Sequence, residues 1–439
     1  MNPVINIEFF YSIFFFSFFI FFYEYKMKII IPTYDRSNRF ETLSFLKKNN
    51  VSIKDIYIFL ASEEEKQKYV NLFGDDYNWI IGVAGLVNQR NFITNYFDEN
   101  EILLCIDDDI EDLLHKDVKP FLDWIDECIN YLRDSNFGIL SINPSVNPFY
   151  FEQRKKSASF KVGNYSCIGA FQILKNCKDL ILSLDNIEDW ERSLLYFKKY
   201  GGNIRYNDIL IKTKYFGKGG LSSQRNKNNY LKSVNKLLCE YPEYIKFNYK
   251  KLPLDKYIQF PNVQFRKVIQ STVDVIELPK MEANELSNLY GMLEDINVTK
   301  RNTRTNRRGF PDGHRAITFG YVRGRFNGKY DLSLCTKKYP HIYQELLRIG
   351  NIYCPFDFSA IHINKDVVCP AHKDSKNVGK SMLLSFGDYT GCNIMIDGKK
   401  YDANCSPLIF DGSNLEHYNT DDLIGTKYSL VFFNGEKSK

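Results

Sequence analysis

The chain has 439 residues, of which 44% are hydrophobic and 25% are charged, and its formal net charge is +5 at pH 7. This length exceeds one ordinary core, so we expect two domains with connecting elements. The composition is that of a soluble globular protein, and so mild a charge does not by itself indicate a nucleic-acid binder. The 10 cysteines include no Cys-x-x-Cys pair, which argues against a zinc ribbon or a disulfide scaffold and fits a cytosol-like compartment. Heavy use of Asn, Lys, Ile, Tyr and Phe suggests an AT-rich genome, viral or otherwise.

Residues 1–26 precede the first predicted strand and are not expected to be part of the fold. Residues 9–22 form an almost unbroken Phe/Ile run, shorter than the ~20 residues that a membrane-spanning helix needs. Glu8 precedes the run in place of a basic residue, and no small-residue cleavage site follows it. We interpret this segment as translated upstream sequence before Met27, with a signal anchor as the alternative. The expected location is the cytoplasm, or the host cytoplasm for a viral protein.

Residues 27–240 alternate between short apolar runs and helical patterns, which predicts a mostly parallel sheet with helices on both faces. The predicted strands are 28–32, 55–60, 79–83 and 101–106, and the predicted helices are 39–48, 63–72 and 88–96. In such sheets the ligand binds at the carboxyl ends of the strands. Thr33, Arg36 and the run Asp107, Asp108 and Asp109 all fall at that edge.

Three consecutive carboxylates repel one another, and a divalent cation such as Mg²⁺ or Mn²⁺ is the usual remedy. The cation could then neutralise a diphosphate leaving group, as sugar-nucleotide chemistry requires. The alternative is an acidic turn that caps a following helix, because Asp is favoured at helix N-termini.

Three segments together resemble the GT-A glycosyltransferases: 31–36 (IPTYDR), 85–91 (GLVNQRN) and 104–109 (LCIDDD). The resemblance covers about residues 27–230 and implies an α/β GT-A domain that uses Mn²⁺ or Mg²⁺ with a nucleotide sugar. It implies that Thr33 and Arg36 contact the nucleotide, and that Arg90 and Asp108 lie at the nucleotide sugar. Asp107 and Asp109 would hold the metal ion.

A second acidic segment, 188–191 (EDWE), precedes a helical pattern. It looks like the segment in which inverting members of this fold keep their catalytic base. An inverting transfer needs one carboxylate to accept the proton of the attacking hydroxyl. We expect Asp189 in that role, with Glu188 as the reserve. Alternatively, both are acids that the helix dipole favours at its N-terminus.

The last third of the chain contains a pattern typical of a metal site. His372 and Asp374 stand two residues apart, so on a strand both side chains project from one face. His417 follows after several strand-like segments. Two imidazoles and one carboxylate form the facial triad of non-haem Fe(II) oxygenases, which leaves coordination positions open. The alternative is two unrelated histidines in an all-β domain.

Lys427 precedes an apolar strand-like run after His417. A cation there is placed to bind the far carboxylate of 2-oxoglutarate while the 2-oxo acid end chelates iron. Lysine offers a point charge, whereas arginine would form two parallel hydrogen bonds with the carboxylate. Considered without the triad, such a lysine is usually a solvated surface charge.

These residues, with several glycine-rich segments, resemble the TET/JBP-type nucleic-acid dioxygenases. The segments that carry the resemblance are Asn364, 372–374, 377–379, 385–391, 410–412, His417 and 427–431. The resemblance implies an all-β double-stranded β-helix (jelly-roll) domain with flanking helices over residues 271–439. It implies oxidation of 5-methylpyrimidines with Fe(II), 2-oxoglutarate and O₂, with Asn364 and Lys427 at the co-substrate and iron site. Lys427 stands where many members have Arg, and Cys392 where a second Gly is common.

The N-terminal half is similar, by the same resemblance, to the TET-associated glycosyltransferases. Between the domains, residues 241–270 are predicted to be a linker. A basic segment follows at 300–308, in which Arg304, Arg307 and Arg308 have no acidic neighbour. Cations there could hold DNA phosphates, and nearby aromatic residues could stack on an extruded base. The alternative is a solvated basic loop.

We therefore predict a bifunctional DNA-modifying enzyme that hydroxylates a 5-methylpyrimidine and then glycosylates the product from a nucleotide sugar. DNA and the sugar donor are the expected partners, and no obligatory protein partner is inferred. One alternative is a hydroxylase and glycosyltransferase of protein side chains such as lysine. Another is a binding module in which one domain has lost its activity.

Overall fold

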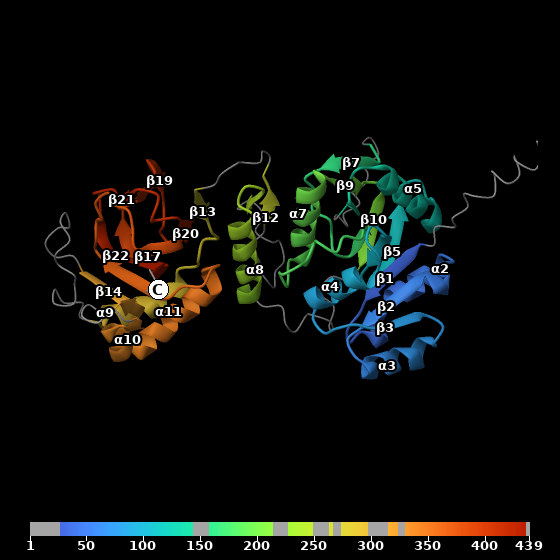
Figure 1. The fold of residues 1–439 in the computed structure, drawn as a ribbon, viewed down its shortest axis with the longest axis horizontal. Helices are drawn as coiled ribbons and strands as arrows, with labels where there is room; N and C mark the ends of the chain where they lie inside the picture. The colour runs from blue at the N-terminus through green and yellow to red at the C-terminus, as the bar shows by residue number, and fades with distance from the viewer. Residues whose placement is uncertain are drawn as a thin grey trace, which may run out of the picture. The chain divides into compact units, whose positions relative to one another are not determined.

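The computed structural model describes residues 27–143, 158–213, 227–248, 263–266, 274–296, 315–323 and 330–435. The chain divides into two compact units (Figure 1). Unit 1 comprises Met1–Leu182 and Leu195–Ser222, and unit 2 comprises Ser183–Leu194 and Ser223–Lys439. The sequence-based domain bounds, 27–240 and 271–439, stay a prediction; helix α8 (Lys227–Glu240) groups with unit 2.

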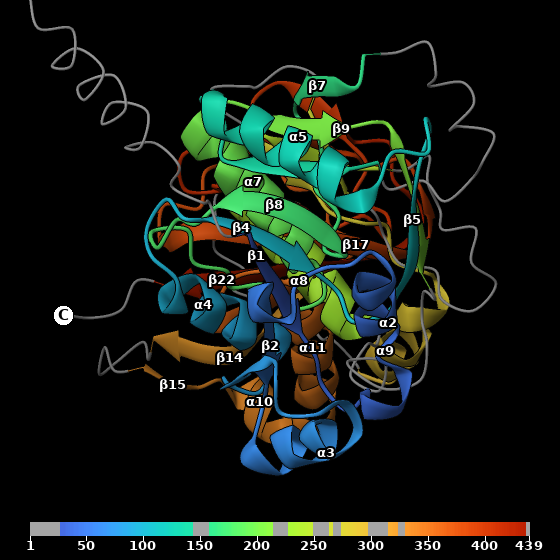
Figure 2. The same ribbon diagram turned by 90° about the vertical axis from the view of Figure 1, so that its right-hand side faces the viewer.

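Unit 1 contains an eight-stranded mixed sheet in the order β3-β2-β1-β4-β8-β6-β9-β7. Its strands are β1 (Lys28–Pro32), β2 (Ile56–Leu60), β3 (Asn78–Ile81), β4 (Ile102–Ile106), β6 (Ile139–Ile142), β7 (Phe160–Gly163), β8 (Phe171–Lys175) and β9 (Asn203–Tyr206). The first four pair in parallel, as predicted. Beyond them β8 runs antiparallel between β4 and β6, so the sheet is mixed (Figure 2 shows β1, β4 and β8 side by side).

Helices cover both faces of this sheet. They are α2 (Glu41–Lys48), α3 (Glu63–Phe73), α4 (Leu86–Tyr96), α5 (Phe121–Asp134) and α7 (Glu188–Tyr200), with 3-10 turns η1 (Ser37–Arg39) and η2 (Ile53–Asp55). One face packs against α2, α3 and α5, where Trp124 is fully buried. The other packs against α4 and the second half of α7 through Ile93 and Tyr196. Strand β5 (Ile110–His115) pairs with β10 (Ile209–Thr213) in a separate ribbon.

Unit 2 contains two antiparallel sheets, of seven strands (β13-β20-β17-β22-β16-β14-β15) and of three (β19-β18-β21). The strands of the larger sheet are β13 (Val275–Glu277), β14 (Arg315–Arg323), β15 (Tyr330–Leu332), β16 (Ala360–Lys365), β17 (Asn377–Thr390), β20 (Leu408–Phe410) and β22 (Ile424–Gly435). The smaller sheet consists of β18 (Ile394–Ile396), β19 (Lys399–Tyr401) and β21 (His417–Asn419). A short pair, β11 (Ile245–Phe247) and β12 (Val263–Phe265), stands apart.

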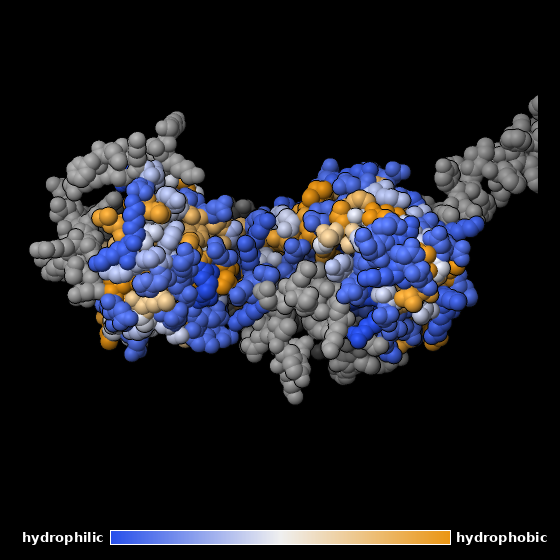
Figure 3. Space-filling view, turned by 90° about the horizontal axis from the view of Figure 1, so that it is seen from below, coloured by the Kyte–Doolittle hydropathy of each residue, from blue (hydrophilic) through white to orange (hydrophobic). Residues whose placement is uncertain are grey.

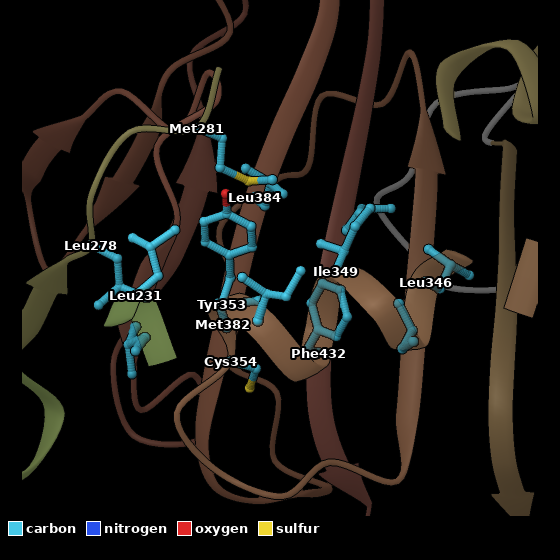
Figure 4. Packing of buried hydrophobic residues seen from close by; sticks show 14 of the residues in the cluster. Leu231, Leu278, Met281, Leu346, Ile349, Tyr353, Cys354, Met382, Leu384 and Phe432 are labelled. Carbon is cyan, nitrogen blue, oxygen red and sulfur yellow. The ribbon is translucent and has the colours of Figure 1, made fainter. Parts of the chain in front are cut away.

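The central strand β22 shows why the larger sheet has two different faces. Tyr428, Leu430 and Phe432 are fully buried in the core that the sheet shares with helices (Figure 4 shows Phe432 in this packing). Full burial of such a side chain contributes ~1.5–3 kcal/mol. The helices are α8, α9 (Asn284–Glu294), α10 (Leu334–Lys338) and α11 (Pro340–Tyr353). Because side chains alternate along a strand, Lys427, Ser429 and Val431 point to the opposite face.

That opposite face, which we call the inner face, carries the second apolar cluster of unit 2. Leu383 and Phe410 of the larger sheet pack there with Ile394 and Ile396 of the smaller sheet. The inner face therefore lies between the two sheets of unit 2.

Among the described residues no helix is long and apolar enough to cross a membrane. The apolar run at 9–22 lies outside the described residues. On the face that Figure 3 shows, most of the coloured surface is hydrophilic.

Candidate functional site

Three side chains in unit 2 converge at metal-binding distances. One ligand atom from each of His372, Asp374 and His417 lies within 4.8 Å of the others. The Asp374 carboxylate oxygens lie 3.8 Å from His372 Nε2 and 3.7 Å from His417 Nε2. Among the described residues this is the only such group of three or more His, Cys, Asp or Glu side chains.

The hydrogen bonds of the two imidazoles define which nitrogen can bind a metal ion. His372 Nδ1 lies 2.7 Å from the Pro370 carbonyl oxygen, and His417 Nδ1 lies 3.0 Å from that of Leu415. Because a carbonyl only accepts, each Nδ1 carries the proton and donates it. The lone pair of each neutral ring is therefore on Nε2, which faces Asp374. Such backbone bonds are the usual way in which a metal-ligating histidine is oriented.

Backbone pairing brings the three ligands together from distant parts of the chain. His372 and His417 form an isolated antiparallel bridge with reciprocal N–H···O bonds of 3.1 and 3.0 Å. The Asp374 amide donates to the Gly412 carbonyl at 2.7 Å. His372 and Asp374 thus lie on an extended segment joined to β21 by one bridge, rather than in a regular strand.

His417 is buried, whereas His372 and Asp374 are partly exposed. Burial alone would lower the pKa of His417, but its hydrogen bonds with Asp374 and the Leu415 carbonyl raise it above its usual value.

Lys427 is a buried cation on the inner face, with 3% of its surface exposed. Its Nζ donates to the Cys392 carbonyl oxygen at 2.7 Å and lies 3.2 Å from Cys392 Sγ and 5.3 Å from the centre of the Tyr389 ring. No carboxylate of the described residues pairs with this ammonium group. A buried charge is usually paired, so the environment of Lys427 favours an anionic ligand.

A row of polar side chains crosses the inner face beside Lys427. Ser385, Ser429 and Asn364 are neighbours in register on β17, β22 and β16. The hydroxyl oxygens of Ser385 and Ser429 lie 3.1 Å apart. Asn364 Oδ1 is buried and has no hydrogen-bond partner among the described residues. Buried polar atoms are nearly always bonded, so Asn364 is available to a bound molecule.

In unit 1 the acidic run directly precedes strand β5, so the helix-capping interpretation was wrong. Arg36 bridges two of the carboxylates, with NH1 2.5 Å from Asp108 Oδ1 and 2.9 Å from Asp109 Oδ2. The Thr33 hydroxyl donates to Asp108 Oδ2 at 2.6 Å, and Thr213 donates to Asp109 Oδ1 at 2.9 Å. Burial raises the pKa of Asp108 to about 6, although Arg36 and Thr33 oppose the shift.

The third carboxylate of the acidic run, that of Asp107, pairs with a different arginine, Arg90. Asp107 Oδ1 lies 2.9 Å from Arg90 NH2, and the Asp107 side chain is 37% exposed. The structure therefore brings Thr33, Arg36, Asp108 and Asp109 together at one edge of the sheet and places Asp107 with Arg90. Sequence reasoning missed Tyr69, whose hydroxyl contacts both Thr33 Oγ1 and the Arg36 amide. No local pattern marks a tyrosine in the middle of α3 as part of this edge.

Glu188 and Asp189 open helix α7 in the segment that groups with unit 2. Asp189 Oδ1 accepts from the amide of the next residue, Trp190, at 2.8 Å within the first turn of the helix. The role of Asp189 as a catalytic base stays a prediction. Arg304, Arg307 and Arg308 lie outside the described residues, as does most of the predicted linker.

The sequence matches no protein-family model, and no curated protein matches it. Among solved structures, NgTET1 in complex with 5mC DNA is 13% identical with a TM-score of 0.31, over 49% of this chain and 96% of that one. The mannosyltransferase PcManGT from Pyrobaculum calidifontis, in complex with GDP-Man and Mn²⁺, is 13% identical with a TM-score of 0.34, over 49% and 63%. A Burkholderia pseudomallei oxidoreductase of the 2OG-Fe(II) oxygenase family is 14% identical with a TM-score of 0.25, over 37% and 87%.

Proposed function

We propose that unit 2 is an Fe(II)- and 2-oxoglutarate-dependent dioxygenase with the jelly-roll fold. The observation that carries this proposal is the convergence of His372, Asp374 and His417, with both Nε2 lone pairs directed at the carboxylate. Two neutral imidazoles and one carboxylate suit Fe(II) and leave further coordination positions open. Zn²⁺ sites more often have a fourth protein ligand or a thiolate, and the described residues place neither here.

Each residue has a role that its surroundings support. The triad would hold Fe(II), which supplies the activation of O₂ needed to hydroxylate an unactivated methyl group. Lys427 would bind the far carboxylate of 2-oxoglutarate by a charge-assisted hydrogen bond. Asn364, which lies beside Ser429 on the inner face, would donate from its amide nitrogen to the same co-substrate.

For unit 1 we propose a GT-A-type glycosyltransferase that uses Mn²⁺ or Mg²⁺ and a nucleotide sugar. The support is the placement of Thr33, Arg36 and the three aspartates at the carboxyl edge of parallel strands, where ligands bind in such sheets. Asp107 and Asp109 would share the metal ion, and Arg36 and Arg90 would turn from the carboxylates to the donor diphosphate. Asp189, with Glu188 in reserve, would take the proton of the acceptor hydroxyl.

The two chemistries form a sequence, because hydroxylation creates the acceptor that a glycosyltransferase requires. We infer that the substrate is a 5-methylpyrimidine in DNA, which must be flipped out of the duplex to reach a buried site. Arg304, Arg307 and Arg308 would hold phosphates near that site.

Mass spectrometry of nucleosides tests the whole assignment. DNA from cells that produce the protein should contain a glycosylated hydroxymethylpyrimidine, and His417→Ala should abolish it. His341→Ala, which changes an exposed histidine on α11, should leave it unchanged. Unmodified DNA together with hydroxylated and glycosylated protein side chains would favour the protein-modifying alternative.

Salt dependence tests the DNA contact directly. If the basic segment neutralises several phosphates, the logarithm of DNA affinity should fall with log salt at a slope of about −0.9 per contact. Neutralising Arg304, Arg307 and Arg308 together should reduce that slope by up to about three units without changing sequence preference. Lys47, Lys48 and Lys54, which are exposed in unit 1, give a control with equal loss of charge. A slope that the arginine changes leave unaltered would assign the segment to a solvated loop.

A further inference from the structure

Cys392, which contacts Lys427, has an unusual backbone conformation. Cys392 has φ 49°, directly after Gly391 at φ 73°. Residues with a Cβ rarely adopt this left-handed conformation, and glycine is the residue that does so without steric cost. A hydrogen bond to a distant part of the chain stabilises this turn: the Cys392 amide donates to Asp422 Oδ1 at 2.8 Å. Glycine would adopt this backbone without steric cost, whereas the cysteine at this position brings its Sγ to 3.2 Å from Lys427 Nζ.

Cys392 provides two possible hydrogen-bond acceptors for the ammonium group of Lys427. An ammonium group has three N–H donors. Cys392 accepts one through its carbonyl oxygen at 2.7 Å, and its Sγ lies 3.2 Å away, where it can accept a second. Cys392 is itself buried, with 2% of its surface exposed. One donor then remains for a bound anion, and its direction is set by the other two contacts.

We propose that Cys392 is a positioning residue for the anion site of Lys427. Its thiol and its carbonyl together hold the ammonium group so that the third N–H points at the carboxylate of the co-substrate. This inference rests on the proposed function of unit 2. Without the thiol the ammonium group keeps the carbonyl hydrogen bond and the more distant Tyr389 ring. It is then less restricted in orientation, so ordering it on an anion costs more entropy.

Three substitutions at this position separate the effects. Cys392→Ala keeps the strained backbone and removes only the thiol contact. Cys392→Ser restores a hydrogen-bond acceptor near the same place. Cys392→Gly removes both the contact and the strain, and relief of that strain should raise the melting temperature by about 2–4 °C.

The measurement is direct binding of 2-oxoglutarate to the Co²⁺-loaded protein by calorimetry, with steady-state turnover alongside. We expect Cys392→Ala to raise the Kd and the KM for 2-oxoglutarate about three- to tenfold at unchanged kcat. Cys392→Ser should recover most of the loss, and Cys392→Gly should bind as weakly as the alanine variant although it is more stable. In a Lys427→Met background, Cys392→Ala should have no further effect.

Cys405 provides a matched control, because it is a second cysteine with a left-handed backbone, at φ 52°, and has no contact with Lys427 in the described structure. Cys405→Ala should leave 2-oxoglutarate binding unchanged. If wild-type protein binds 2-oxoglutarate and Cys392→Ala binds it equally well, the positioning role is overturned while the proposed function stands. If wild-type protein binds Co²⁺ but no 2-oxoglutarate, both are overturned. Parallel Co²⁺ titrations show that each variant is folded at the metal site.

Discussion

The two carboxylate sites of this protein differ in what surrounds the negative charge. In unit 1, Arg36 and Arg90 between them contact Asp107, Asp108 and Asp109. In unit 2, Asp374 faces the Nε2 atoms of two histidines whose protons are directed away from it. The first site already has cationic partners of its own, whereas the second presents three lone-pair donors to one point.

This difference shows that an acidic motif does not by itself indicate how much a site needs a metal ion. A cation placed between Asp374 and the two Nε2 atoms would contact all three groups. The acidic run of unit 1 is partly neutralised within the protein, so a divalent ion there must compete with Arg36 for Asp109. We therefore expect the site in unit 2 to bind metal ions more tightly than the site in unit 1. The following predictions test this comparison, from the largest expected effect to the smallest.

Loss of a triad ligand should have the largest effect. Replacing His372, Asp374 or His417 with Ala should abolish stoichiometric Co²⁺ binding at the site and formation of succinate from 2-oxoglutarate. The reason is that the two remaining ligands cannot hold the ion in a facial arrangement. Spectroscopic Co²⁺ titration and a succinate assay check both points. Full turnover in His417→Ala would contradict the assignment, and His341→Ala should behave as wild type.

In unit 1, Asp107→Asn together with Asp109→Asn should remove Mn²⁺-dependent sugar transfer and leave hydroxylation intact. The amides keep the shape of the side chains but lose the charge that a divalent ion requires. Transfer of radiolabelled sugar to a hydroxymethylated oligonucleotide measures the effect. Asp75→Asn with Asp76→Asn, two exposed aspartates of the same unit, is the control. Unchanged transfer in the first double variant would leave the acidic run with a purely structural role.

Lys427→Met should weaken binding of 2-oxoglutarate by about 10²-fold, because truncating one partner of a buried charge pair costs ~2–5 kcal/mol. Co²⁺ binding should persist, since Lys427 is not one of the three ligands. Calorimetry with the Co²⁺-loaded protein gives both values. Lys400→Met, at an exposed position on β19, should leave the affinity unchanged. Equal affinity in Lys427→Met and wild type would place the co-substrate carboxylate elsewhere.

The arginine pairing in unit 1 predicts a stability effect. Arg36→Ala should destabilise unit 1 by about 3 kcal/mol, because it leaves the buried Asp108 carboxylate without its cation. Adding Asp108→Asn should restore much of that loss, which a double-mutant cycle would detect. Hydrogen exchange in β1 and β4 under increasing urea reports on this unit by itself. Arg133→Ala, at an exposed position on α5, should have little effect.

The local pattern of apolar residues was sufficient to predict the first seven strands and α-helices of unit 1. The strand 28–32 was predicted with the bounds that β1 has, and the other strands and helices up to residue 106 differ by two residues or fewer at each end. These elements are readable because the spacing of apolar residues follows the backbone repeat. The spacing of His372 and Asp374 indicated that they share a site, although they lie on an extended segment with one bridge and not in the regular strand that was expected.

Other features depend on contacts between residues far apart in the chain. The antiparallel β8, the pairing of Arg36 with the acidic run and the contact of Cys392 with Lys427 had no local signal. Each joins elements that meet only once the sheets have formed. An arginine pairs with whichever carboxylate packing brings within reach, and a turn can tolerate a left-handed cysteine only when its neighbours hold it there. The sequence by itself thus determined the order of the elements and the candidate ligands, whereas the tertiary structure decided which charges are neutralised within the protein and which remain for a ligand.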